Sequence, residues 1–86
     1  MPRYLSQHTI ACLTRQGAEQ LAARLSAASA VRTHRVLLAL QDGKMLVEFE
    51  AGNREELEKF LVKEKFHFDW ILRVEYESDA GKLVAV

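Results

Sequence analysis

The sequence contains one cysteine, Cys12, no long apolar run and no excess of charge of either sign. A single cysteine cannot form an internal disulfide or a cysteine-rich zinc cluster, and it suits a reducing compartment. No arrangement of histidine and acid is visible around this thiol. We therefore expect Cys12 to pack as a small apolar residue rather than to act as a nucleophile.

The N-terminal residues include no apolar stretch of signal-peptide length. Nowhere does an apolar run approach the roughly 18 residues that a membrane-spanning helix needs. We therefore expect a cytoplasmic protein without a membrane partner. The 12 basic residues balance 12 acidic ones, so the chain has no overall field that would attract nucleic acid. We expect no nucleic-acid partner.

The length of the chain, 86 residues, corresponds to one domain, and the apolar share of 49% is typical of a folded globular protein. A domain of this size buries a smaller share of its surface than a larger one, so dimerisation would add stability. We expect the domain to cover residues 1–78. The last segment, residues 79–86, is then a tail or a short added strand.

Strand and helix patterns alternate along the chain. Branched and alternating apolar residues predict strands over residues 4–13, 31–40, 45–50 and 69–77. Apolar spacings of three and four predict helices over residues 15–28 and 54–64, capped by Thr14 and Asn53. This order predicts an α+β fold, the ferredoxin-like βαββαβ sandwich, in which a four-stranded antiparallel sheet carries both helices on one face. Its first and third strands would be central, and its second face would be open.

The open face gathers most candidate site residues. Alternation in the last strand assigns one set to the core: Trp70, Leu72, Val74 and Tyr76. The alternate set falls on the open face: Ile71, Arg73, Glu75 and Glu77. The third strand adds Leu46, Glu48 and Glu50. These carboxylates would repel phosphate, which disfavours RNA binding on this face.

His8 lies in the first strand, where neither alternate set is clearly apolar, so periodicity leaves its direction open. On the open face it would lie near Glu48, Arg73 or Glu75. Imidazole and carboxylate are usable ligands for Ni or Zn, and an imidazole beside a carboxylate can transfer protons. A structural ion-pair ladder would use the same residues, and no HExxH motif is present. Two further histidines lack an identifiable partner, His34 near the core edge and His67 on the surface or packed between aromatic residues.

Three segments, MPRYLSQHTIACLT, DGKMLVEFEAGNREELEKFL and FHFDWILRVE, cover most of the chain. In their order and spacing the chain resembles a family of small bacterial ferredoxin-like proteins, classed as a domain of unknown function, some of which are described as nickel-binding. The nickel-binding type has acid-x-His in its first strand, which corresponds to Ser6-Gln7-His8. The resemblance implies that His8 faces the open side with Ser6, which stands where the family has a carboxylate.

Together these observations predict a homodimer that binds a small ligand or a divalent transition metal at its open sheet face. The candidate ligand-binding residues are Ser6, His8, Glu48, Arg73 and Glu75, with His8 and Glu48 as metal ligands. The alternative is a homodimeric interaction or ligand-binding module without metal, because Leu46 and Ile71 would suit a partly apolar contact. A dimeric-barrel enzyme is a third class. No nucleophile, base and oxyanion site can be assembled, so we name no catalytic residue.

Overall fold

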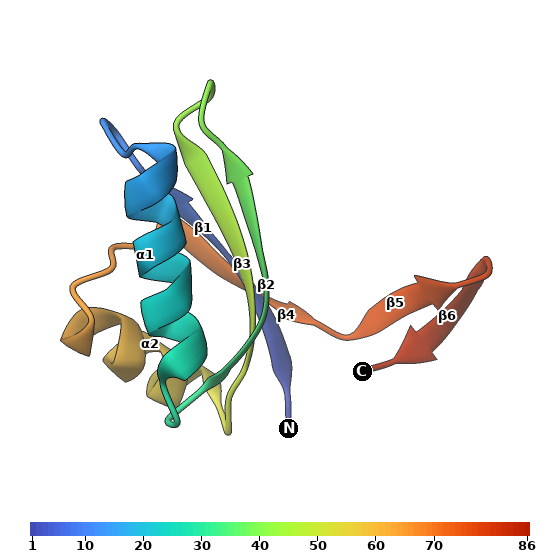
Figure 1. The fold of residues 1–86 in the computed structure, drawn as a ribbon. Coiled ribbons are helices and arrows are strands. Elements are labelled where there is room, and N and C mark those ends of the chain that lie inside the picture. Colours follow the sequence, from blue (N-terminus) through green and yellow to red (C-terminus); the bar gives the residue numbers. More distant parts are fainter.

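The computed structural model describes residues 1–86 and contains two helices, a four-stranded antiparallel sheet and a separate two-stranded hairpin (Figure 1). The main sheet has the order β2-β3-β1-β4, with β1 (Arg3–Thr9), β2 (Arg32–Ala39), β3 (Lys44–Glu50) and β4 (Trp70–Val74). The other elements are α1 (Arg15–Ala27), α2 (Arg54–Lys63), β5 (Tyr76–Asp79) and β6 (Lys82–Ala85). The predicted α+β class is therefore confirmed, with its two helices and its four-stranded antiparallel sheet.

Both helices begin at the capping residues that the sequence indicates. The Thr14 hydroxyl accepts a hydrogen bond from the Gly17 amide at 3.0 Å, and the Asn53 side-chain oxygen accepts one from the Glu56 amide at 2.8 Å. Each contact satisfies an amide that has no partner within the helix. The two helices cover the same face of the sheet (Figure 1). Neither has the length and apolar content that crossing a membrane would require.

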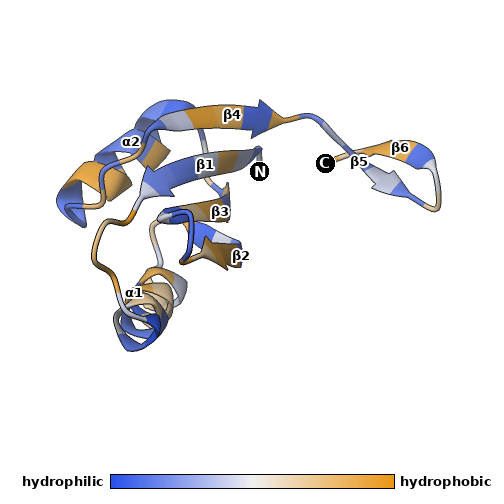
Figure 2. Ribbon diagram, turned by 90° about the horizontal axis from the view of Figure 1, so that it is seen from above, coloured by the Kyte–Doolittle hydropathy of each residue, from blue (hydrophilic) through white to orange (hydrophobic).

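The core fills the space between the helices and the sheet. Strand β3 contributes Met45, Val47 and Phe49, all fully buried, and the helices contribute Leu25, Leu57 and Leu61. Phe49 contacts Phe60 of α2 edge to face, with ring centroids 6.2 Å apart. Seen from above, the helices lie to one side of the sheet and the hairpin extends away from them (Figure 2). The opposite face of the sheet carries no helix.

The predicted faces of the last strand are wrong. Ser6 pairs with Ile71 and Leu5 pairs with Leu72, so Ile71 lies on the helix side and Leu72 on the open side. Ile71 is 4% exposed, whereas Leu72 is 55% exposed. Hydropathy favoured the set of Trp70, Leu72 and Val74, but the set that contains Ile71 and Arg73 lies on the helix side. The pairing of β4 with the neighbouring strand β1 determines which of its side chains are buried.

The C-terminal segment forms a hairpin. The predicted strand over residues 69–77 is interrupted at Glu75, and Tyr76 begins β5. The chain then reverses at Ala80 and Gly81, whose φ angles of 52° and 86° are those of the tight turns that connect twisted strands. Of the two alternatives for the end of the chain, the structure has the added strand, β6. The boundary predicted after residue 78 falls inside β5.

Strand β1 ends at Thr9, earlier than the predicted residue 13. Cys12 lies in the following turn with a positive φ of 62°, and its side chain is exposed. The expectation that Cys12 packs in the core is therefore wrong. Its position in an exposed turn, and not its apolar character, decides its burial.

Candidate functional site: a buried histidine and the open sheet face

His8 lies in the core on the helix side of the sheet, and its side chain is fully buried. It pairs with the buried Met45 of β3, and its ring stacks on Phe66 with the ring centroids 3.7 Å apart. Ser6, two residues earlier, is also fully buried. The prediction that Ser6 and His8 face the open side is therefore wrong. Their alternate set belongs to the core because Tyr4 and Ile10 at its ends are buried, and the two polar side chains satisfy each other.

Both ring nitrogens of His8 have hydrogen-bond partners. Nδ1 lies 2.7 Å from the backbone carbonyl oxygen of His67, which can only accept, so Nδ1 carries the proton and donates. Nε2 lies 2.7 Å from the Ser6 hydroxyl and accepts a hydrogen bond from it. Burial lowers the pKa of His8, opposed by the bond to the His67 carbonyl and by the charge of Asp69. The structure thus holds His8 as the neutral Nδ1–H tautomer.

This Ser6–His8 pair has the composition of an activated nucleophile, a hydroxyl beside an imidazole oriented by a third group. Both side chains are completely buried, however, so no substrate atom reaches the Ser6 oxygen. Neither ring nitrogen of His8 has a free lone pair, because Nδ1 donates and Nε2 accepts. A metal could bind His8 only by breaking one of these bonds. The pair is a polar link inside the core.

The buried neutral His8 makes stability depend on pH. The unfolded chain binds a proton at this residue near the ordinary value of 6.5, whereas the folded core holds the pKa lower. As pH falls below about 6.5, the unfolded state therefore binds more protons and the free energy of unfolding decreases until the folded pKa is passed. We expect the urea midpoint to fall between about pH 7.5 and about pH 5.5. Urea unfolding at the two pH values measures this change.

A His8→Gln variant is the control for this pH dependence, because it removes the titrating group and keeps polar atoms in the core. Glu50 and Asp69 also have lowered pKa values, but carboxyl groups titrate below this range. The variant should therefore show a smaller fall of the urea midpoint than the original chain. An equal fall in both proteins would assign the pH dependence to other groups.

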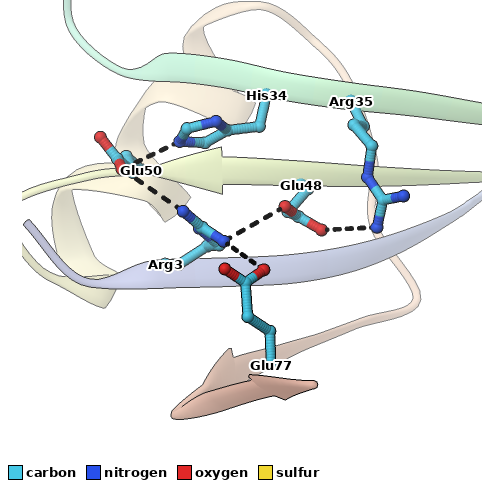
Figure 3. A network of polar contacts seen from close by, with 6 residues as sticks. All are labelled: Arg3, His34, Arg35, Glu48, Glu50 and Glu77. Atoms are coloured by element: carbon cyan, nitrogen blue, oxygen red, sulfur yellow. Dashed lines mark hydrogen bonds and ion pairs between the residues drawn. The ribbon is translucent and has the colours of Figure 1, made fainter. Parts of the chain in front are cut away.

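The open face carries an ion-pair network at one end (Figure 3). Arg3 lies at its centre, with its guanidinium 3.8 Å from Glu48, 4.0 Å from Glu50 and 3.1 Å from Glu77. Arg35 contacts the other oxygen of Glu48 at 3.1 Å. The network links strands β1, β2, β3 and β5. Because Arg3 lies among three carboxylates, it supplies the positive charge that a bound cation would otherwise supply.

His34 joins the network through a β-bulge. The register of β2 against β3 shifts between Thr33 and Arg35, which leaves His34 as the extra residue. Its Nε2 lies 2.9 Å from Glu50 Oε1, and this contact is the main cause that lowers the pKa of Glu50. The expectation that His34 lies near the core edge is wrong, because the bulge interrupts the alternation and turns the side chain to Glu50 on the open face. The sequence shows no signal for it.

The predicted ligand residues do not come together. His8 is on the helix side, whereas Glu48 faces the open side, so the predicted metal pair is separated by the sheet. Arg73 pairs with the buried Tyr4 and belongs to the helix side at the sheet edge, and Glu75 lies in the link between β4 and β5. Only Glu48 belongs to the open-face network. No group of three or more His, Cys, Asp or Glu side chains is arranged to hold a metal ion.

A second polar cluster lies at the other end of the open face. Asp69 accepts hydrogen bonds from the Thr9 hydroxyl at 2.8 Å and from the Gln7 amide at 3.2 Å. These two bonds are the main reason that the pKa of Asp69 is lowered, and the nearby charge of Lys44 adds to them. Lys44 in turn donates to the Thr9 hydroxyl at 2.9 Å. The cluster fixes the loop before β4 to the ends of β1 and β3.

Between the two polar ends lies a strip of large apolar side chains, which we call the apolar band: Leu5, Leu37, Leu46, Trp70 and Leu72. Leu37 lies directly opposite Leu46, and Leu5 directly opposite Leu72. Leu37 is 47% exposed, although it lies among other apolar residues. The sequence predicted Leu46 and Ile71 at this place, and Ile71 lies on the helix side instead. Correct assignment of β1 would have added Leu5, and through the register Leu72.

The largest cavity is a groove of about 560 Å³ away from the open face, between the end of α1 and the side of α2. It is formed in part by Ala28 and Phe60, and its polar residues are one serine, two lysines and two glutamates. It contains no histidine or cysteine. We find no set of groups there that could carry out chemistry.

No protein-family model matches the chain, and no curated protein or solved structure shows significant similarity to it. The resemblance to the family with nickel-binding members therefore stays a prediction. The function has to be inferred from the arrangement of the side chains. The open face offers the apolar band between two polar clusters, whereas the buried Ser6 and His8 offer no access to a ligand.

Proposed function

We propose that the protein is a ferredoxin-like module that forms a homodimer through the open faces of its two sheets. The ferredoxin-like assignment is supported by the inner position of β1 and β3 and by the two helices on one face. The apolar band is the main observation that supports a dimer. Leu37 and Leu72 are about half exposed in the single chain, and a contiguous exposed apolar surface is typical of a contact site.

The surface of the single chain is larger than its mass predicts. Its accessible area is 5971 Å², whereas a monomeric protein of 9.8 kDa exposes about 5,200 Å². The excess of about 800 Å² includes the surface of the β5–β6 hairpin, whose strand residues are all exposed. The radius of gyration of 13.2 Å also exceeds the roughly 12 Å of a compact chain of this length. Both values favour a chain that is one half of a dimer.

The charges of the open face suit a second copy of the same chain. A twofold contact places the same surface patch on both sides, so a patch of one sign would repel itself. Here each polar end carries both signs: Arg3 with Glu48 and Glu50 at one end, and Lys44 with Asp69 at the other. The chain as a whole has no net charge. Electrostatic repulsion therefore does not oppose self-association.

The module needs no metal for this contact. The groups that form the apolar band are hydrocarbon and indole side chains, and Arg3 balances the carboxylates beside them. This corresponds to the alternative that the sequence left open, a homodimeric interaction module. Association through the apolar band would also add stability to a small domain that buries few residues.

Sedimentation velocity of the untagged protein tests the proposal. Over a range up to about 100 μM we expect the mass to rise toward twice 9.8 kDa. The rise should persist after treatment with a chelator, because the apolar band and not a metal holds the copies together. A constant mass of one chain over the whole range would refute the dimer. A dimer that dissociates on chelation would instead favour a metal-linked contact.

A further inference from the structure

The hairpin formed by β5 and β6 projects from the end of β4 and is a sheet of its own (Figures 1 and 2). Every residue of its two strands is exposed. A two-stranded hairpin alone in water is marginally stable at best, and it needs a third strand or a packed face to persist. The hairpin therefore requires a surface that covers one of its faces.

The two faces of the hairpin differ in chemistry. Tyr76 pairs with Ala85 and Ser78 pairs with Leu83, so these four side chains share one face. The other face carries Glu77, Asp79, Lys82 and Val84. On the first face Tyr76 is 56% and Leu83 is 73% exposed. This face is the one that a contact would cover.

The apolar face of the hairpin does not pack on the four-stranded sheet of the same chain. Glu77, on the charged face, forms the 3.1 Å ion pair with Arg3 of β1, so the charged face is the one turned toward the chain's own sheet. Tyr76 and Leu83 therefore point away from it. Only Glu75 separates β4 from β5, which leaves little freedom for the hairpin to turn over. The apolar face must be covered by another molecule.

We propose that the hairpin is an arm that each chain of the dimer packs on the other chain. Its apolar face would lie on the second copy, beside that copy's apolar band. This inference rests on the proposed dimer. A second copy fits because each chain supplies both an uncovered hairpin face and an uncovered sheet face, and a twofold axis covers both at once. The reciprocal contact would cover exposed surface on both chains, and each chain exposes about 800 Å² more than a compact monomer of its mass. The neutral overall charge allows two identical chains to approach.

A variant that combines Tyr76→Ser with Leu83→Ser tests the arm, and Val84→Ser is the matched control on its charged face. Sedimentation equilibrium should show that the dissociation constant of the dimer rises about tenfold or more in the double variant and less than about threefold in the control. The hairpin lies outside the core, so the urea midpoint of the monomeric domain should change little. Equal dissociation constants for the original chain, the double variant and the control would refute the contact made by the hairpin. They would leave the proposed dimer unaffected.

A second measurement does not depend on the variants. In a mixture of isotope-labelled and unlabelled chains, intermolecular nuclear Overhauser effects should connect the Leu83 methyl groups to leucine methyl groups of the second copy. If the wild-type protein dimerises and Leu83 shows contacts only within its own chain, the arm is refuted while the dimer stands. If the wild-type protein stays monomeric up to about 100 μM, both the dimer and the arm are refuted.

Discussion

Replacement of His8 by alanine should lower the free energy of unfolding by about 3 kcal/mol. The ring is fully buried and stacks on Phe66 at 3.7 Å, so its removal leaves a cavity in the core. It also leaves the His67 carbonyl without its partner and the Ser6 hydroxyl with only the 3.4 Å contact to the Val47 carbonyl. Urea unfolding at about pH 7.5, where His8 is neutral, measures the loss.

His34→Ala is the matched control, because this histidine lies half-buried on the open face and contacts a carboxylate. Its loss should cost less than about 1 kcal/mol. Calorimetric titration of both variants and the original protein with Ni²⁺ provides the second readout. If His8 were a metal ligand on an open face, His8→Ala would abolish saturable Ni²⁺ binding with little loss of stability. That result would contradict the buried position of the ring.

The order of the elements could be predicted because it depends on local signals. Thr14 and Asn53 mark the helix starts by capping, and both caps are present at the expected residues. The reversal between β2 and β3 follows the Asp-Gly pair, where Gly43 has a positive φ of 66°. These signals act within a few residues. They need no knowledge of the rest of the fold.

The faces of the strands could not be predicted in the same way, because they depend on partners far along the chain. The inward set of β1 contains a serine and a histidine, and their burial is made acceptable by the His67 carbonyl, 59 residues away. In β4, hydropathy favoured the set with Trp70 and Leu72, but the register with β1 placed Ile71 on the helix side. In β2, a bulge at His34 shifted the alternation. A candidate site built on side-chain direction therefore failed where the order of elements succeeded.

The resemblance placed Ser6 and His8 on the open face, which is also where the rule that isolated polar groups are costly to bury would place them. That rule does not hold for polar groups that satisfy one another, as Ser6 and His8 do. The sequence placed only Leu46 and Ile71 as apolar residues on the open face, and Ile71 is buried on the helix side. The resulting apolar band is the feature that the sequence indicated least and the proposed function uses most.

Replacement of Leu72 by aspartate should abolish dimerisation at concentrations where the original chain associates. Leu72 lies in the apolar band opposite Leu5, and it is 55% exposed in the single chain, so the monomer should tolerate the change. In the dimer the carboxylate would be buried against apolar side chains without a partner, which raises the dissociation constant about 100-fold or more. Sedimentation equilibrium measures this constant.

The matched control for Leu72→Asp is Val62→Asp. Val62 lies on α2, on the opposite side of the molecule from the open face, and it is 74% exposed. The two variants introduce the same charge on exposed apolar residues, so any effect of net charge on association is the same in both. We expect Val62→Asp to dimerise as the original chain does. If both variants dimerise equally well, the open face is not the contact surface. If only Val62→Asp dissociates, the helix side must form the interface instead.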